Sequence, residues 1–479
     1  DVSDNTVTAF TGAATLTSSG TLTGSPVTSA AFTNGVLASQ AVTITNVGSF
    51  SITATSGSTG TSNTFTVTPG AAVAAQSTAS VPAGTSGAVT TITIQAKDAS
   101  GNNRTATSGA VAVSVTGANT ATATVVDNLD GTYTATYTPT VSGTDNVAIT
   151  LGGSAISGSP FTSAVAVGAL ANFAVTNTSG GSIAAQTAGT GFNIKVVARD
   201  ANNNTVTSFT GTVDLTSTGT LTGAPITTAA FTAGVLASQA VTITNTSSFT
   251  ITATASGKTG TSNSFSVVAG ASNAATSTAS VPSTGTAGSL TSMTIQAKDA
   301  NGNNRTSGGD AVVVSVTGAN VASASVTDNA NGTYTATYTP TVAGADAIAI
   351  TLGGVAISGS SFASTIGPAS LHHFAVTNTS NGSIGTQAAG TAFNIKVVAQ
   401  DANNNTVTGF TGTVDISSTG TLSGGSGTTA AFTAGVLATH SVTISNTGTF
   451  TVTATRTSGG VQTGTSNSFL VASGAATAL

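Results

Sequence analysis

Apolar and polar residues alternate along most of this 479-residue chain. One stretch has apolar side chains at Phe192, Ile194 and Val196, and another has them at Val241 and Ile243. A period of two is that of a β-strand, because successive side chains point to opposite faces of a sheet. Turn-like stretches such as "DANNN" and "STGT" interrupt these runs and indicate about seven short strands in each hundred residues or so. No stretch shows an apolar stripe of helical period bounded by capping residues. The pattern predicts an all-β chain of antiparallel sandwiches with almost no helix.

Two long phrases of the sequence each occur twice. "FNIKVVARDANNNTVTSFTGTVDLTSTGTL" starts at Phe192 and returns, slightly changed, at Phe393, and "DNLDGTYTATYTPTVSGTDNVAITLGG" starts at Asp127 and returns at Asp328. Both spacings are 201 residues (393 − 192 and 328 − 127). Two kinds of unit, A and B, each of about 100 residues, therefore alternate along the chain. The expected order is a partial A unit at 1–70, a B unit at 71–168, an A unit at 169–268, a B unit at 269–367, and an A unit with a tail at 368–479.

Short joints of Gly, Ala and Pro, such as "VTPGAAVAA" and "TIGPASLHHF", separate these units. Joints of this length leave neighbouring sandwiches in contact, so we expect a stiff rod. Each complete A unit is expected to bury six phenylalanines. These are Phe173, Phe192, Phe209, Phe231, Phe249 and Phe265 in one copy and Phe374, Phe393, Phe410, Phe432, Phe450 and Phe469 in the other.

The composition narrows the function. Only 5% of the residues are charged, and 9 Lys and Arg against 14 Asp and Glu give a net charge of −5, so we expect no nucleic-acid partner. The absence of Cys excludes disulfides and thiolate metal sites, and it is compatible with an extracellular protein. No apolar run approaches the roughly 20 residues that a bilayer requires. We expect this to be a segment without its targeting leader and without a membrane span.

The B motif "DGTYTATYTPT" carries a family resemblance. A turn with Gly precedes a strand with two tyrosines, and a Pro ends that strand. The positive φ that Gly tolerates fits the turn, and the two tyrosines, at i and i+4, should share one face of the strand. The motif residues are Gly131, Tyr133, Tyr137 and Pro139 in the first copy and Gly332, Tyr334, Tyr338 and Pro340 in the second. Together with the closing "ISGSPF", this pattern resembles the second half of a filamin-type immunoglobulin repeat.

The A motif "KVVARDANNNTVTSFTGTVDL" resembles the immunoglobulin-like repeats of invasin and intimin adhesins. The resemblances imply a tandem array of immunoglobulin-like domains from a bacterial surface protein. They imply roles in spacing, adhesion and filament building. Filamin repeats bind partners by adding a strand to an exposed sheet edge.

The chain offers little for catalysis. His372 and His373 are adjacent, so their side chains are expected to point to opposite faces of a strand, and His440 stands where the other copies have Gln40 and Gln239. A catalytic triad needs a histidine, and most units lack one. We therefore expect no catalytic residues, no bound metal and no enzyme activity.

Turns rich in Asp and Asn leave the binding of one cation, Ca²⁺, as an open alternative. "DASGNN", "DANNN" and "DANGNN" concentrate oxygen atoms that could hold Ca²⁺ at a domain junction. The same residues are the ordinary ones of tight turns, and each loop has only one carboxylate. The calcium candidates are Asp98, Asp200, Asp299 and Asp401. Otherwise no cofactor is expected.

The first A unit lacks the counterpart of residues 169–199, which is 31 residues (199 − 169 + 1). A sandwich without these strands would expose its core and unpaired backbone groups. Three alternatives stay open: preceding residues of the protein complete it, a neighbouring subunit donates a strand and so builds a fibre, or its edge stays unpaired. The candidate donor is the tail "SFLVASGAATAL", from Ser468 to Leu479.

The sequence thus predicts a structural segment of a long bacterial extracellular or cell-surface protein, without enzyme activity. It would form part of a fibre, stalk, sheath or adhesin shaft and would self-associate into filaments. The alternative is a binding module: an adhesin that grips a cell-surface or matrix ligand through a sheet edge, or the spacer of a secreted enzyme.

Overall fold

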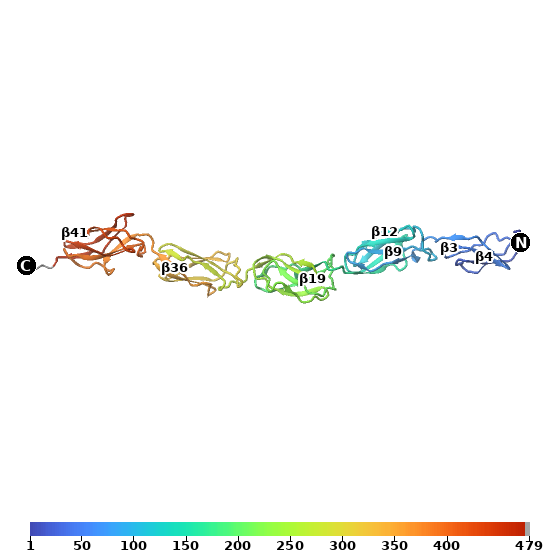
Figure 1. The fold of residues 1–479 in the computed structure, drawn as a ribbon, viewed down its shortest axis with the longest axis horizontal. Coiled ribbons are helices and arrows are strands. Elements are labelled where there is room, and N and C mark those ends of the chain that lie inside the picture. The colour runs from blue at the N-terminus through green and yellow to red at the C-terminus, as the bar shows by residue number, and fades with distance from the viewer. Residues whose placement is uncertain (475–479) are drawn as a thin grey trace, which may run out of the picture.

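The computed structural model describes residues 1–474, and these form a partial first unit and four complete β-sandwiches that follow one another in a line (Figure 1). The N-terminus lies at one end of the rod and the third A unit at the other. Within residues 1–474 the one helical element is the short 3-10 turn η1 (Ala74–Gln76). The prediction of an all-β chain is confirmed. Among the same residues, no helix is long and apolar enough to cross a bilayer.

Each B unit packs a four-stranded sheet against a larger one. In the first B unit the strand orders are β12-β13-β9-β7 and β11-β10-β14-β16-β8, with β15 paired to β14. Its strands are β7 (Thr78–Ser80), β8 (Gly84–Thr85), β9 (Thr90–Gln95), β10 (Val111–Gly117), β11 (Ala121–Thr122), β12 (Thr124–Asp127), β13 (Thr132–Tyr137), β14 (Gly143–Leu151), β15 (Ser154–Ala155) and β16 (Phe161–Ala166).

The second B unit repeats this topology strand for strand, as the sequence repeat predicts. Its strands are β27 (Thr278–Ser280), β28 (Thr284–Thr286), β29 (Thr291–Gln296), β30 (Val312–Gly318), β31 (Ala322–Ser323), β32 (Ser325–Asp328), β33 (Thr333–Tyr338), β34 (Gly344–Leu352), β35 (Val355–Ala356) and β36 (Phe362–Gly367).

Alternation along the strands sets the B core. In β13, Tyr133, Ala135 and Tyr137 are buried, and the threonines between them face outward. Ile92 and Ile94 of the paired strand β9 are fully buried on the same side. The expectation that the two tyrosines share one face is confirmed.

Each complete A unit contains three small sheets. In the second A unit these are β17-β19-β22, β18-β26-β23 and β21-β20-β24-β25. Its strands are β17 (Asn172–Asn177), β18 (Gln186–Thr187), β19 (Phe192–Arg199), β20 (Asp214–Ser217), β21 (Ile226–Thr227), β22 (Val235–Val241), β23 (Ser247–Phe249), β24 (Ile251–Ala255), β25 (Lys258–Thr261) and β26 (Phe265–Val268).

The third A unit is built in the same way, with one additional strand, β41, beside β43. Its strands are β37 (His373–Asn378), β38 (Gln387–Ala388), β39 (Phe393–Gln400), β40 (Val414–Ser418), β41 (Leu422–Gly424), β42 (Gly427–Thr428), β43 (Val436–Ile444), β44 (Gly448–Phe450), β45 (Val452–Arg456), β46 (Thr463–Thr465) and β47 (Phe469–Ala472). All twelve expected phenylalanines belong to the A cores or pack against them; Phe192, Phe209, Phe393 and Phe450 are only partly buried.

The first A unit has fewer strands. One sheet has the order β2-β1-β4-β5, and β3 pairs with β6. Its strands are β1 (Thr15–Ser18), β2 (Val27–Thr28), β3 (Gly48–Phe50), β4 (Ile52–Ser56), β5 (Ser58–Thr61) and β6 (Phe65–Val67). Residues 1–70 contain no counterpart of β17 and β19, and Val42 is 36% exposed whereas the equivalent Val241 is 2% exposed.

The prediction that the C-terminal tail is a donor strand has to be corrected. Phe469–Ala472 forms β47, which pairs antiparallel with β44 and parallel with β38 inside its own unit. These residues complete the third A unit, because Phe469 and Val471 are buried in its core. The prediction that they are a free donor strand is wrong. Residues 475–479 of the tail lie outside the described residues.

Candidate functional site at the domain junctions

The four candidate calcium aspartates all lie in loops at domain junctions, and each closes its own loop. The carboxylate of Asp98 accepts hydrogen bonds from the backbone N–H groups of Ser100 and Asn102, both at 2.9 Å, and from the Asn102 side chain. Asp200, Asp299 and Asp401 make the corresponding bonds. All four side chains are buried.

The same carboxylates hold the joint between two units. Each accepts a hydrogen bond from a backbone N–H of the preceding linker, with nitrogen-to-oxygen distances of 2.9 to 3.0 Å. The four pairs are Gly70 to Asp98, Gly168 to Asp200, Gly270 to Asp299 and Ala369 to Asp401. The direction of the linker is therefore fixed relative to the unit that follows it.

An asparagine four residues after each aspartate reaches the preceding unit. The Asn102 side-chain amide donates to the carbonyl of Thr45 at 2.7 Å, and Asn204 donates to the carbonyl of Thr140 at 2.9 Å. Asn303 and Asn405 donate in the same way to Thr244 and Thr341. We call each Asp–Asn pair a junction clamp: Asp98–Asn102, Asp200–Asn204, Asp299–Asn303 and Asp401–Asn405.

Where an A unit precedes a B unit, an arginine also holds the joint. Arg104 donates to the carbonyl oxygens of Pro69 and Gly70, at 3.0 and 2.5 Å. Arg305 donates to the carbonyl of Gly270 at 2.6 Å. The linker in these junctions is thus bound at its N–H by a carboxylate and at its carbonyl by a guanidinium.

Where a B unit precedes an A unit, the two copies differ. In both, the clamp asparagine also accepts a bond from the preceding unit, from Ser142 N–H to Asn204 at 3.1 Å and from Ala343 N–H to Asn405 at 2.8 Å. In the first copy, Ser86 adds a hydroxyl that accepts from Asn202 at 2.9 Å and from Asn204 at 2.8 Å. The second copy has alanine at the position of Ser86 and lacks these two bonds.

Burial and hydrogen bonding act in opposite directions on the clamp carboxyl groups. Burial is the largest single influence and raises the pKa. The bonds from the asparagine side chain and from three backbone N–H groups together outweigh it, and they hold the pKa of each group below its ordinary value of 3.8. The carboxylates are therefore charged at neutral pH. Their oxygens face N–H donors, which a calcium ion would have to displace, and within residues 1–474 no three His, Cys, Asp or Glu side chains cluster.

The glycine of the B motif supports the junction from within the unit. Gly131 has φ of +85° in the turn before β13, and a Cβ there would lie 2.0 Å from the carbonyl oxygen of Arg104. Gly332 has φ of +82° and the same close approach to Arg305. The glycine thus lets the loop that carries the arginine pack closely on the turn. The same arginine binds the linker.

The first tyrosine of the motif is tied to the loop before β10. The Tyr133 hydroxyl donates to the carbonyl of Gly109 at 2.8 Å and accepts from Ser108 N–H at 2.9 Å. Tyr334 donates to the Asp310 carboxylate and accepts from the Asp310 backbone N–H.

The second tyrosine belongs to a buried network that the sequence analysis missed. The Tyr137 hydroxyl donates to Asp145 at 3.1 Å, and Asp145 also accepts from the backbone and side chain of Asn119. The Asn119 side-chain carbonyl accepts from Thr140 and Val141 N–H, at 2.8 and 2.9 Å. The network therefore orders the loop that meets the clamp of the next unit. The signal for it was present, since Asp145 is an acidic residue at a strand position that faces the core.

The second B unit repeats this network with Tyr338, Asp346 and Asn320. Burial, followed by the hydrogen bond to Asp346 and its charge, raises the pKa of Tyr338 to about 12. The motif prolines follow the tyrosine strands, and their carbonyl oxygens accept hydrogen bonds within the same unit. The Pro139 carbonyl accepts from Gly87 N–H at 2.8 Å, and the Pro340 carbonyl accepts from Gly288 N–H at 2.7 Å.

The histidines give one correction. His440 bonds through Nε2 to the Gly425 carbonyl at 2.8 Å. His372 and His373 do not point apart, because their Nδ1 atoms are 3.3 Å from each other. The prediction of opposite faces is wrong, since β37 begins at His373 and His372 precedes the strand.

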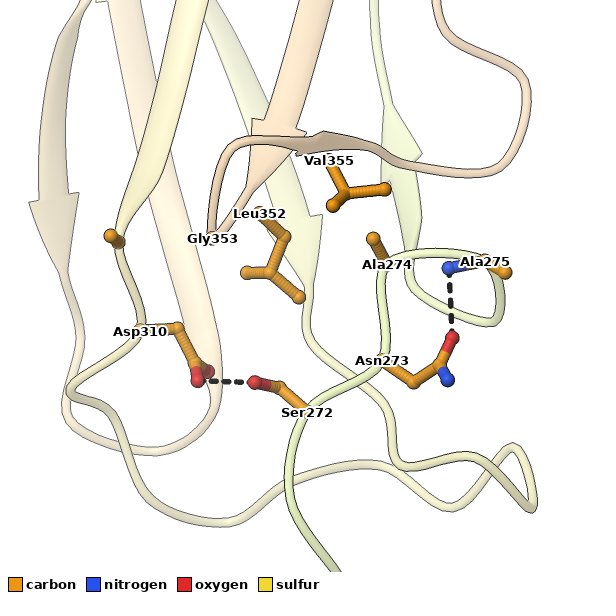
Figure 2. A pocket seen from close by; sticks show the side chains of 9 residues that line it. Ser272, Asn273, Ala274, Ala275, Asp310, Leu352, Gly353 and Val355 are labelled. Carbon is orange, nitrogen blue, oxygen red and sulfur yellow. Dashed lines mark hydrogen bonds between the residues drawn. The ribbon is translucent and has the colours of Figure 1, made fainter.

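A depression of about 410 Å³ lies at the end of the second B unit, next to its junction (Figure 2). Its polar groups bond to one another: Ser272 donates to Asp310 at 2.5 Å, and the Asn273 side chain accepts from Ala275 N–H at 2.9 Å. Leu352 and Val355 line the apolar side. These groups complete a loop, and they do not form a nucleophile and base pair.

Comparison with protein families identifies the B units. Residues 66–162 and 268–363 match the family described as Filamin/ABP280 repeat. The two B units are filamin-type repeats. These ranges begin five residues before the expected start at 71 and one residue before the expected start at 269, each within the last strand of the preceding A unit.

Solved structures give more distant likenesses. Comparison of the sequence with curated proteins gives no match. Among solved structures, the chain is similar to the FdeC adhesin of Escherichia coli, with 25% identity over 63% of this chain and 99% of that one and a TM-score of 0.32. It is similar to invasin, a bacterial integrin-binding protein, with 17% identity over 82% and 79% and a TM-score of 0.33. The Lin-41 filamin domain has 21% identity over 20% and 97%, with a TM-score of 0.18.

Proposed function

We propose that this chain is a stiff, non-enzymatic shaft segment of a bacterial extracellular or cell-surface protein. The observation that supports this proposal most strongly is the recurrence of the junction clamp at all four junctions, with equivalent bonds to the linker and to the preceding unit. The proposed role of the chain is to set the distance and direction between whatever lies at the two ends of the shaft.

The clamp opposes bending for a physical reason. Rotation of one unit against the next separates the asparagine from its carbonyl partner and the carboxylate from the linker N–H. A buried carboxylate that loses a donor without replacement costs about 1 to 3 kcal/mol or more. Stiffness therefore comes from a few directed bonds at each joint, and it does not require large apolar interfaces between the units.

The surface suits an extracellular shaft that associates with copies of itself in a fibre, stalk or sheath. Outward positions of the sheets carry mainly threonine and serine, and only 5% of residues are charged. Long-range repulsion between copies is therefore weak, and side-by-side packing into a filament is possible without charge compensation.

A second function is favoured by one observation on the second B unit. Val313 and Val355 are 57% and 61% exposed, at positions that hold Ala112 and Ser154 in the first B unit. Exposed apolar side chains at these two positions of one copy only favour a binding module that grips a surface or matrix ligand through a sheet edge.

Electron microscopy and small-angle scattering of the purified chain test the proposal. The shaft predicts rods about 200 Å long, taking roughly 40 Å for each sandwich, with a scattering profile that one rigid conformation fits. Long polymers would support filament assembly by this segment, and isolated rods would limit it to a spacer. A chain of flexibly linked beads would refute the shaft.

A further inference from the structure

Two imidazole rings converge where the third A unit begins. The Nδ1 atoms of His372 and His373 lie 3.3 Å apart, and the ring planes are inclined by 84°. His372 is exposed and His373 is partly exposed, so solvent reaches the pair.

The two ring nitrogens are within hydrogen-bond distance of each other, and the same separation is the nitrogen-to-nitrogen distance across a chelated metal ion. An ion held tetrahedrally by two imidazoles at about 2.0 to 2.1 Å places the nitrogens about 3.3 to 3.4 Å from each other. Either ring nitrogen of a neutral histidine can coordinate, and imidazole suits Zn²⁺, Cu²⁺ and Ni²⁺. We propose that His372 and His373 chelate one divalent late first-row metal ion.

The second A unit shows that the fold does not require this pair. The equivalent residues are Ala171 and Asn172, yet the backbone bonds are the same: Ala171 N–H donates to the Arg199 carbonyl and His372 N–H to the Gln400 carbonyl, both at 2.8 Å. The histidines are thus an addition to a backbone that forms without them.

The residue opposite the pair also differs between the two A units, and the difference favours a bound cation in the third. In the second A unit Arg199 stands across the strands from Asn172, whereas in the third Gln400 stands across from His373. Directly opposite side chains lie within about 5.5 Å at their Cβ atoms, so an arginine there would repel a bound metal ion. The third A unit has both gained two ligands and lost the arginine across the strands.

Two protein ligands leave at least two coordination positions of the ion open to water or to a ligand from outside the chain. Selectivity should follow the general order in which Cu²⁺ binds more tightly than Ni²⁺ or Zn²⁺. A hard ion such as Ca²⁺ or Mg²⁺ prefers oxygen ligands and should not bind to the pair.

Isothermal titration of the full chain with ZnCl₂ and CuCl₂ tests the proposal. We expect one ion per chain, with tighter binding of Cu²⁺, and an electron paramagnetic resonance spectrum of the Cu²⁺ complex that shows two coupled imidazole nitrogens. The variant His372→Ala with His373→Asn recreates the residues of the second A unit, so it should keep the wild-type melting temperature. Loss of a second-shell group already weakens metal sites by roughly 10- to 100-fold, so this variant should lose more than about tenfold in affinity.

The matched control is His440→Gln, which recreates the residue of the other A units and should bind as the wild type does. Unchanged binding in the His372 and His373 variant, loss of binding in the His440 variant, or a spectrum with one imidazole nitrogen would each overturn the proposal. So would the absence of Cu²⁺ binding by the wild-type chain.

Discussion

At the scale of single residues, the clamp aspartates were candidate calcium ligands in the sequence, and in the structure they accept hydrogen bonds from N–H groups. Each carboxylate receives N–H donors from its own loop and from the linker. A buried negative charge is stable there because the donors replace the water that it loses. One aspartate thus shapes a turn and orients a neighbouring domain.

The lowered pKa of these groups predicts a dependence of stability on pH. Because the folded pKa lies below the ordinary value of 3.8, the folded state binds fewer protons than the unfolded state near that pH. The stabilisation is complete above the unfolded value and is lost as the pH falls through the folded one. Calorimetry should show a melting temperature that is nearly constant from pH 5 to 7 and falls below pH 4. A chain with all four aspartates changed to Asn should be less stable at pH 6 and show a smaller fall, and an equal fall would contradict the assignment.

Another residue-scale prediction concerns Gly131. Alanine there meets two penalties, a left-handed backbone that costs about 1 to 2 kcal/mol and a Cβ 2.0 Å from the Arg104 carbonyl oxygen. Gly152 also has positive φ, +59°, but no atom lies within 4 Å of its Cβ position. In chemical denaturation Gly131→Ala should lose more stability than Gly152→Ala, by about 1 to 3 kcal/mol for the overpacking. Equal losses would show that the close approach is not important.

At the scale of elements, β13 and β14 are joined by the Tyr137–Asp145 bond as well as by core packing. Tyr137→Phe keeps the ring but removes a donor from a fully buried carboxylate. The expected loss is about 1 to 3 kcal/mol in the free energy of unfolding of the first B unit. Thr136→Val on the outward face of the same strand should change it by less than about 0.5 kcal/mol. Denaturant titrations of the two variants decide this, and a neutral Tyr137→Phe would mean that the hydroxyl bond is dispensable.

Element by element, the sequence predicted what depends on local pattern. Alternation located strands such as β13 and β19, and the glycine and proline positions located their ends. The clamp could not be predicted, because the partner of Asn102 is the carbonyl of Thr45, 57 residues away in another unit. Every residue has a backbone carbonyl, so the amino-acid sequence does not indicate which one accepts this hydrogen bond. The histidine pair was misjudged because the rule of opposite faces applies only inside a strand, and His372 lies just before one.

At the scale of the whole molecule, the two junctions from a B unit to an A unit should differ in stiffness. The junction at Asn204 has the Ser86 hydroxyl as an additional partner, and the junction at Asn405 has Ala287 instead. Each missing bond removes one of the contacts that oppose rotation between the units. The joint with Ala287 should therefore sample a wider range of angles.

The chain has no cysteine, so two spin labels can be placed at single introduced cysteines without background. Thr134→Cys with Thr252→Cys spans the first such junction, and the equivalent pair Thr335→Cys with Thr453→Cys spans the second. Pulsed dipolar spectroscopy should give a broader distance distribution across the second junction. Adding Ser86→Ala should broaden the first distribution, and adding Ala287→Ser should narrow the second, because the serine restores a partner for the clamp asparagine. If the two widths are equal and neither exchange changes them, the hydroxyl does not contribute to stiffness, and the rod must be held straight by the bonds that both junctions share.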